Sequence, residues 1–464
     1  MCRGNDPTCA EFEIHHRQFQ EDMARERRSF LASAFAAKGG VAALTAGGMR
    51  PLARKILPTA RHHHLPATAD TVHWGYFSKN LKPQLEVEPG DFVTIETLTH
   101  QASDDHERMI EGDLGAESVY LWTRDRKGVE RRGAGPGDGK GLGVHICTGP
   151  VMVRGAEPGD VLEVRIVDVA LRPSANPKFL GFAFGSNAAA NWGYHYNDFL
   201  TGETREVVTI YELDASGQRN WARAVYNFRW PEIVDPFGVK HPTIDYPGLP
   251  VDHALTVRNW DVLKGVRIPV RPHFGVMGLA PKEADDVNSV PPSYTGGNID
   301  NWRIGKCAAV YYPLAVPGAL LSVGDPHASQ GDSELCGTAV ECSLTGTFQL
   351  ILHKAAGLAG SALEAVDFPM IETAGEYVLQ GFSYPNYLAD LGTNAQSEIF
   401  QKSSVDLAMR DAFRKMRRFL MTAKHLTEDE AISLMSIAVD FGVTQVVDGN
   451  WGVHAIVRKD IFPG

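Results

Sequence analysis

The feature that most constrains the fold is a repeated turn that leads into an alternating strand. Glu88-Pro89-Gly90-Asp91 precedes Phe92–Ile95, and the same four residue types recur at Glu157-Pro158-Gly159-Asp160 before Val161–Ile166. Proline followed by glycine favours a tight turn, and alternation after it is typical of a half-buried strand. A related run begins at Val316-Pro317-Gly318. Strand, turn and strand units without intervening helices predict a mainly β fold with an antiparallel β-sandwich or barrel-like core.

The periodicity changes near the end of the chain. Ser404 can cap a helix that runs through Leu420, and Thr427-x-x-Glu430 is a capping box for a second helix. A last strand is expected around Gly452–Val457. We therefore expect a small C-terminal helical hairpin packed on the β-core, which makes the fold α+β.

Three parts of the chain follow from these patterns. Residues 1–69 are interpreted as an export signal and linker, and residues 70–400 as the β-rich core. Within the core, residues from about 170 to 292 are rich in Pro, Gly, Asn and aromatics, and we expect loop excursions and short strands there. Residues 401–464 hold the helical hairpin and the final strand.

The N-terminus has the pattern of a twin-arginine export signal. Arg27-Arg28 stands before the mildly apolar, Ala/Gly-rich segment Ala32–Met49. An amphipathic N-terminal helix is the alternative, and Lys38 inside the apolar stretch favours it. No later segment offers about 18 uninterrupted apolar residues, so we expect no stable membrane span. The expected location is periplasmic, or cytoplasmic if the signal is not used, and His62-His63-His64 is assigned to a flexible linker.

Composition excludes several classes of protein. The chain has 464 residues, of which 44% are hydrophobic and 22% are charged, which is typical of a globular protein with two or three packed layers. The formal net charge of -11 argues against nucleic acid as a partner. The one basic cluster, Arg414 to Arg418, lies in a helical pattern and is expected to be a solvated face.

One short segment gathers the residue types of a hydrolytic site, namely Asp325, His327, Gln330, Glu334 and Cys336. Asp325 and His327 are two apart, so on an extended strand their side chains leave from the same face and can hold one ion. The alternative is that Gly324-Asp325 and Gly331-Asp332 are ordinary turn signals beside a hydrogen-bonded histidine.

The run from Tyr312 to Gly337 resembles the signature of the acetamidase/formamidase family, whose members hydrolyse short-chain amides to carboxylate and ammonia. Further matches follow in family order: His73-Trp74-Gly75, His145 to Pro150, Arg154 to Leu162, Phe274 to Pro281, Gly296 to Asp300 and Thr444 to Gly449. The chain departs from the commoner family form at Ser333, where glycine is frequent.

Amide hydrolysis needs an activated water or nucleophile, stabilisation of the oxyanion, and an acid for the leaving nitrogen. A divalent cation can supply the first two. His145, Asp325 and His327 are the expected ligands, and this set fits zinc best, whereas carboxylates and carbonyls alone would admit calcium or magnesium. The segment from His100 to Arg108 is a secondary source of ligands, and Asp105 is chosen from it.

Glu334 is the expected general base or acid, and its alternative is a buried structural ion pair. Asn298 and Asp300 can anchor the substrate amide or complete a metal shell, unless Gly-Gly-Asn is an ordinary turn. Gln330 is assigned to substrate binding.

A cysteine mechanism stays open at this point. Cys336 is two residues after Glu334, Cys147 is two after His145, and on strands each pair would share a face. A nucleophilic thiol needs a neighbouring cation to lower its pKa, and no lysine stands close in sequence. The chain has no C-x-x-C, and disulfide pairing cannot be deduced from the spacing of its six cysteines.

The sequence thus predicts a metal-dependent amidohydrolase acting on small linear amides of the formamide or acetamide type. The partner is a small-molecule substrate, and the resemblance implies a homo-oligomer. Two alternatives from other classes are a non-catalytic metal-containing β-protein that binds a small polar ligand, and a structural β-protein with an unused site.

Overall fold

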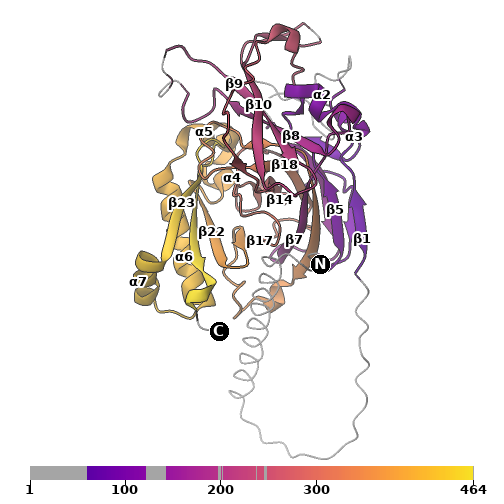
Figure 1. Ribbon diagram of the computed structural model, residues 1–464. Helices are drawn as coiled ribbons and strands as arrows, with labels where there is room; N and C mark the ends of the chain where they lie inside the picture. The colour runs from indigo at the N-terminus through magenta and orange to yellow at the C-terminus, as the bar shows by residue number, and fades with distance from the viewer. Residues whose placement is uncertain are drawn as a thin grey trace, which may run out of the picture.

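The computed structural model describes residues 60–121, 143–196, 200, 202–236, 238–244 and 248–462. Two large sheets dominate this part of the chain (Figure 1). The first has nine strands in the order β1 (His62–Leu65), β5 (Phe92–Glu96), β20 (Leu344–His353), β7 (Val161–Leu171), β17 (Ala309–Pro313), β21 (Met370–Glu372), β22 (Glu376–Phe382), β24 (Gly452–Arg458) and β23 (Val439–Gln445).

The second sheet has eleven strands. Its main path is β13 (Ile268–Pro269), β10 (Trp221–Arg229), β9 (Val207–Asp214), β8 (Phe182–Ala189), β19 (Val340–Glu341), β18 (Leu321–Ser329), β14 (His273–Gly278) and β16 (Gly296–Asn298). From β18 it continues through β6 (Ile146–Val153) to β2 (Val72–Trp74) and β4 (Leu85–Val87). Two small sheets pair β11 (Ile233–Val234) with β12 (Lys240–His241), and β3 (Tyr76–Ser78) with β15 (Asp286–Asn288).

The main hydrophobic core lies between the two large sheets. Ile95, Val164 and Phe348 of the nine-stranded sheet belong to the same buried cluster as Phe274 and Val323 of the eleven-stranded sheet. The rings of Phe274 and Phe348 meet with centroids 5.4 Å apart. Among the described strands, every pairing is antiparallel except β1 with β5 and β4 with β6. The expected β-sandwich is therefore confirmed, and the described strands form no closed barrel.

The repeated turns connect the two sheets. In the first, the Asp91 amide donates to the Glu88 carbonyl at 3.1 Å, and in the second the Asp160 amide donates to the Glu157 carbonyl at 3.0 Å. Gly90 and Gly159 have φ of 97° and 91°, the left-handed conformation that such a turn requires at its third residue. Each turn carries the chain from a strand of the eleven-stranded sheet, β4 or β6, to one of the nine-stranded sheet, β5 or β7.

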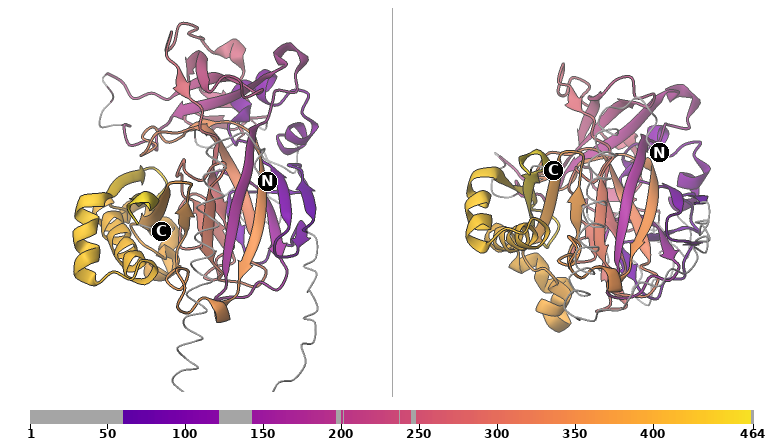
Figure 2. Two further views of the ribbon diagram at one scale, coloured as in Figure 1. Left: turned by 60° about the horizontal axis from the view of Figure 1, so that its bottom comes forward. Right: turned by 90° about the horizontal axis from the view of Figure 1, so that it is seen from below.

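The C-terminal helices are α6 (Val405–Ala423) and α7 (Glu428–Ala438), close to their expected bounds. Both hydrogen bonds of the Thr427–Glu430 capping box are present, whereas the Ser404 side chain makes no capping bond. Helix α6 packs against β22 and β24, and α7 packs against α6 and β23. Both helices lie on one flank of the sandwich (Figure 2). The shorter helices are α2 (His106–Met109), α3 (Leu114–Val119), α4 (Tyr387–Asp390) and α5 (Ala395–Lys402).

Two expectations about the chain's organisation need correction. His62–Leu65 is not linker but the edge strand β1, parallel to β5, and His63 Nε2 lies 2.9 Å from Asp91 Oδ2. Residues 170–292 also contain more than short strands, because β8, β9 and β10 are eight or nine residues long and extend the second sheet. The predicted export motif lies outside the described residues. Across the described ranges, no helix combines the length and apolarity that crossing a bilayer requires.

The turn geometry gives a test of the fold. Replacing Gly90 with alanine meets no atom within 4 Å, so its cost comes from the left-handed backbone alone. We expect Gly90→Ala to lower the free energy of unfolding by about 1 kcal/mol in chemical denaturation. Gly375→Ala is the matched control, because that position is also open but has no positive φ. Equal effects of the two substitutions would contradict the turn assignment.

Candidate active site

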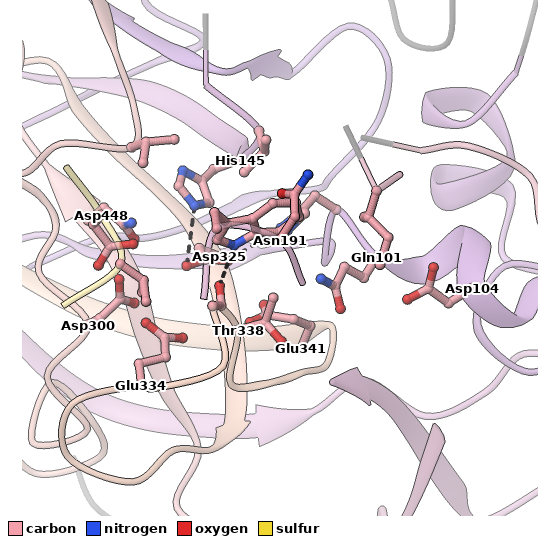
Figure 3. Close-up of a pocket in the computed structure, with 18 of the residues that line it drawn as sticks. Gln101, Asp104, His145, Asn191, Asp300, Asp325, Glu334, Thr338, Glu341 and Asp448 are labelled. Atoms are coloured by element: carbon pink, nitrogen blue, oxygen red, sulfur yellow. Dashed lines mark hydrogen bonds and ion pairs between the residues drawn. The ribbon is translucent and has the colours of Figure 1, made fainter. Parts of the chain in front are cut away.

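A cavity of about 290 Å³ opens beside strands β16, β18 and β19 (Figure 3). Its lining includes six carboxylates, from Asp104, Asp300, Asp325, Glu334, Glu341 and Asp448, all of them buried. Two buried histidines, His100 and His145, line the same cavity. Carboxylates are seldom buried unless they are paired or hold a cation, so this concentration marks a functional site.

Strand β18 supplies the centre of the site. Asp325 and His327 stand two residues apart, and His327 Nε2 lies 3.0 Å from Asp325 Oδ2. The neighbouring strands bring further groups, since the register pairs His327 with His273 of β14 and with Glu341 of β19. His327 Nε2 lies 3.2 Å from Glu341 Oε1. The expected pairing of Asp325 with His327 on one face is therefore present.

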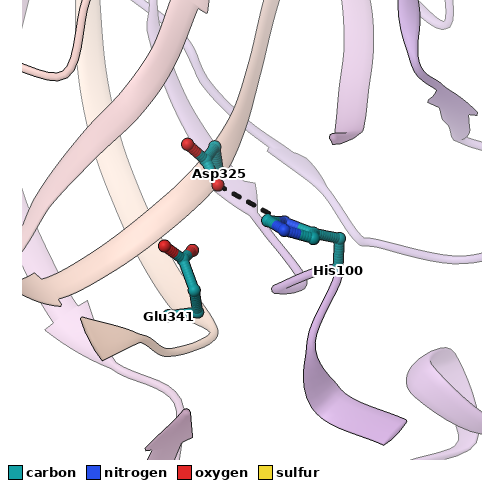
Figure 4. Close-up of side chains that lie close together, drawn as sticks. All are labelled: His100, Asp325 and Glu341. Carbon is teal, nitrogen blue, oxygen red and sulfur yellow. Dashed lines mark ion pairs between the residues drawn. The ribbon is translucent and has the colours of Figure 1, made fainter. Parts of the chain in front are cut away.

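The first candidate metal-ligand group consists of His100, Asp325 and Glu341 (Figure 4). One ligand atom from each lies within 4.8 Å of the others, and His100 Nδ1 is 3.4 Å from Asp325 Oδ1. His100 Nδ1, Asp325 Oδ1 and Glu341 Oε2 are buried, and within the described part of the chain they have no hydrogen-bond partner. Two carboxylates and an imidazole with unsatisfied atoms turned together form a donor set that a divalent cation fits.

His145 stands at the edge of this group. Its Nε2 lies 3.7 Å from Asp325 Oδ2, and its Nδ1 lies 2.9 Å from the Ser289 hydroxyl oxygen. The contact to Ser289 orients the ring, which leaves Nε2 directed toward Asp325.

The second group consists of Asp300, His327 and Glu334, which also present ligand atoms within 4.8 Å of one another. Asp300 shares a side-chain hydrogen bond with Asp448. Because a hydrogen bond between two carboxyl groups needs a proton, this side of the cavity is suited to holding and moving protons.

The pKa values divide the carboxyl groups into two kinds. Burial opposes ionisation of Asp325, but the His327 and His145 rings hold its pKa well below the ordinary value. Burial raises the pKa of Asp300 to about 7. Burial and the Asp300 charge raise the pKa of Glu334 well above its ordinary value. One carboxylate is thus held ionised while its neighbours favour the protonated form.

The pKa values of the two histidines are also shifted in opposite directions. Burial lowers the pKa of His145 to about 4. Burial alone would also lower the pKa of His327, but the Glu341 and Asp325 carboxylates raise that pKa well above the ordinary value. Opposite charge at short distance therefore outweighs desolvation at His327 and not at His145.

The backbone around the site is held in the left-handed region. Asp300, Asp325 and Glu334 have φ of 52°, 47° and 47°. Such a conformation is uncommon for residues other than glycine, and three cases on one cavity indicate a conformation maintained for function. Ser333, where the family often has glycine, has φ of 83°. The serine therefore occupies a backbone position that suits glycine, and Glu334 still reaches the cavity.

Gly275 of β14 makes room for the central groups. A Cβ at this position would lie 2.3 Å from Asp300 Oδ1, 2.5 Å from Asp325 Oδ2 and 2.6 Å from His327 Cε1. These distances are far shorter than van der Waals contact, so only glycine lets the three side chains converge there.

The residues predicted from sequence are only partly brought together. His145, Asn298, Asp300, Asp325 and Glu334 line the cavity. The Asn298 side-chain oxygen is buried without a hydrogen-bond partner among the described residues, as a substrate-anchoring group would be. The other predicted residues lie behind the cavity wall or outside it.

Gln330 is behind the wall. Its Oε1 lies 2.7 Å from His273 Nε2 and 3.1 Å from His327 Nδ1, and its Nε2 donates to the Asp300 carbonyl at 2.6 Å. These contacts engage both ends of the side-chain amide, so Gln330 positions His327 and is not available to substrate.

Asp105 and Cys336 do not line the cavity. The Asp105 carboxylate accepts from Tyr226 at 2.7 Å and from Arg108 at 2.8 Å, so it is an anchor for α2. Asn187 Nδ2 donates to Cys336 Sγ at 3.2 Å. Burial raises the pKa of Cys147 far above its ordinary value, which disfavours a thiolate there. Cys147, Cys336 and Cys342 are free thiols.

Three residues of the cavity, His100, Glu341 and Asp448, were not predicted from the sequence. His100 belongs to the segment from which Asp105 was chosen, and the family match at Thr444 to Gly449 includes Asp448. Nothing in the sequence marked Glu341, because it reaches the site through the pairing of β19 with β18.

Fold and site together define a β-sandwich with a carboxylate and imidazole centre. The family model described as the Acetamidase/Formamidase family matches residues 142–285 and 283–463. The chain belongs to this family.

Two curated relatives are similar over part of the chain. An acetamidase of Mycolicibacterium smegmatis is 30% identical over 42% of this chain and 50% of its own length. A formamidase of Methylophilus methylotrophus is 32% identical over 42% of this chain and 48% of its own length. The chain thus spans about half the length of the curated relatives it matches.

Solved structures of two acetamidases resemble the fold over most of its length. The Bacillus halodurans enzyme superposes with a TM-score of 0.57, at 21% identity, over 86% of this chain and 98% of its own. The Yersinia enterocolitica enzyme gives 0.58, at 23% identity, over 88% and 94%. At these identities the likeness supports the fold.

The space above Gly275 gives a test of the site. Gly275→Ala should displace Asp300, Asp325 and His327, and we expect the affinity for Zn²⁺, measured by calorimetry, to fall roughly 10–100-fold. Gly331→Ala is the control, since a Cβ there meets nothing within 4 Å. Unchanged Zn²⁺ affinity in a folded Gly275→Ala variant would contradict the site.

Proposed function

We propose that this protein hydrolyses short-chain linear amides, of the formamide or acetamide type, to a carboxylate and ammonia. The observation that carries the proposal is the meeting of two groups in one buried cavity. The group of His100, Asp325 and Glu341 is suited to a cation. Asp300 and Glu334 of the second group, with Asp448 beside them, are suited to proton transfer. Membership of the family and the names of the relatives support the same chemistry.

We propose further that His100, Asp325 and Glu341 hold a divalent cation, with His145 and His327 beside them. The unsatisfied buried atoms of these residues support this assignment. The mixture of imidazole and carboxylate ligands favours zinc over magnesium or calcium. Such an ion supplies Lewis acidity, which polarises a carbonyl and makes water a better nucleophile.

Glu334 is the proposed proton carrier. It takes a proton from the attacking water as the new C–O bond forms, and it delivers a proton to the nitrogen as the C–N bond breaks. The attack requires the ionised form of Glu334, and the raised pKa of Glu334 then favours retention of the proton until the C–N bond breaks. One side-chain oxygen each of Asn298 and Asp300 is buried and has no hydrogen-bond partner among the described residues. These oxygens are the proposed acceptors for the substrate N–H groups.

Ammonia release from formamide and acetamide by the purified protein tests the proposal. We expect activity to disappear after chelation and to return with zinc. Glu334→Gln removes the proton carrier with little change of shape, so kcat should fall roughly 10²–10⁴-fold. Zn²⁺ binding by the variant, measured in parallel, separates loss of catalysis from loss of the ion.

Cys336→Ser is the control for the competing cysteine mechanism. Its thiol lies against Asn187 and outside the cavity, so ammonia release should be essentially unchanged. Activity that survives chelation but is lost in Cys336→Ser would instead favour a thiol nucleophile. No release from either amide by the folded, zinc-loaded protein would favour the binding-protein alternative.

We propose that the protein is exported to the periplasm. The support is the Arg27-Arg28 pair with the apolar segment after it. Cell fractionation should find the protein in the periplasm, and replacing both arginines with lysine should retain it in the cytoplasm. The same distribution for both forms would contradict export by this route.

We also propose a homo-oligomer, as the family resemblance implies. Met409 and Phe413 are large, exposed apolar side chains four residues apart on α6, and they offer a surface for association. Light scattering after size exclusion should give a multiple of the 50.7 kDa chain mass, and the mass of a single chain would contradict the proposal.

A further inference from the structure

The cavity is lined by carboxylates at its floor and by apolar side chains at its mouth. The carboxylates on the floor are almost completely buried, with Asp325 at 3% and Glu341 at 1% exposure. Trp192 and Phe400 line the same cavity but are 37% and 48% exposed, so they stand at its opening. We call the apolar lining the rim, made of Trp192, Trp230, Ile244, Leu249, Val290 and Phe400.

The rim is held in place by a buried carboxylate. Glu206 accepts through its two carboxylate oxygens from the backbone amides of Asn191 and Ile244, both at 2.8 Å. Its carbonyl accepts from the Trp230 amide at 3.0 Å. One side chain with its own backbone therefore fixes three separate segments that carry Trp192, Ile244 and Trp230. Such an arrangement makes the rim a built wall and not a set of loose surface residues.

Trp192 is also tied to the segment that carries Glu334. Its indole Nε1 donates to the Gly337 carbonyl at 3.0 Å, and the Ala190 amide donates to the Cys336 carbonyl at 3.1 Å. A Cβ on Gly337 would lie 2.5 Å from Trp192 Nε1, so the indole packs directly on that backbone. The aromatic wall is thus placed a few residues from the proposed proton carrier.

The space is large for the smallest amides. The cavity has about 290 Å³, which is at the lower end of the range of about 300–1,000 Å³ for small-molecule sites. The one-carbon acyl group of formamide or the two-carbon group of acetamide would leave most of the cavity to water and would not reach the rim. Without an apolar ligand group against it, the apolar wall would stay in contact with water, which is unfavourable.

We propose that the preferred substrate is a primary amide with a bulky, flat apolar acyl group of the benzamide type. This inference rests on the amide hydrolysis of the proposed function and extends the substrate class from short-chain linear amides to aromatic ones. The carboxamide lies on the carboxylate floor and the aromatic ring lies against Trp192 and Trp230. Water adds to the carbonyl carbon, the C–N bond breaks, and the products are an aromatic carboxylate and ammonia, with Glu334 moving the proton to nitrogen.

The experiment compares kcat/KM for benzamide, phenylacetamide and acetamide. We expect benzamide to exceed acetamide by about tenfold or more, because each further buried carbon strengthens binding in an apolar pocket. Trp192→Ala should reduce the benzamide to acetamide ratio about tenfold, and Trp192→Phe should restore most of it. Trp221→Ala on β10 is the control, because that indole stacks on Arg219 outside the cavity.

Binding provides a second measurement that does not depend on turnover. Calorimetry with Glu334→Gln should give a lower Kd for benzamide than for acetamide, and Trp192→Ala should remove the difference. Hydrolysis of acetamide with slower hydrolysis of benzamide overturns this inference and leaves the proposed function standing. An equal effect of Trp192→Ala on both amides also overturns it. No hydrolysis of any amide overturns both.

Discussion

The site depends on the electrostatics of Asp325. This carboxylate is buried and contacts His100, His145 and His327, which come from three separate parts of the chain. Its pKa is held well below the ordinary value by those rings, so it stays ionised where an isolated carboxylate would take up a proton. Burial raises the pKa values of Asp300, Glu334 and Glu341, and the Asp325 charge raises them further.

The β-sandwich holds these buried charged groups together at one place. Strand β18 lies in the middle of the second sheet, and its hydrogen bonds to β14, β19 and β6 fix the backbone that carries Asp325 and His327. The same pairings deliver His273 and Glu341 and keep Gly275 beneath the cluster. The stability of the apolar core between the sheets therefore offsets the cost of three left-handed residues and several buried carboxylates.

The sequence predicted local structure better than long-range assembly. The Glu-Pro-Gly-Asp turns and the Thr427 capping box were predictable because each depends on neighbouring residues whose conformational preferences are strong. The pairing of Asp325 with His327 followed from strand geometry in the same way. Glu341 could not be found, because its place in the site comes from the register of two strands, and register is decided by packing across a whole sheet.

Two further features could not be predicted from the sequence, because they also depend on long-range assembly. His62–Leu65 forms an edge strand only because β5 offers an unpaired edge, and a polar triplet of histidines carries no signal of that. Asp105 and Asp104 are adjacent in sequence, yet one turns to Arg108 and Tyr226 while the other lines the cavity. A run of candidate ligands therefore indicates the region of a site, and only the fold selects the member that faces it.

The most direct test of the account is anomalous X-ray diffraction from crystals of the zinc-loaded protein, measured on both sides of the zinc absorption edge. We expect one strong peak within bonding distance of His100 Nδ1, Asp325 and Glu341. A peak elsewhere in the molecule, or none in zinc-loaded crystals, would contradict the assignment of the central site.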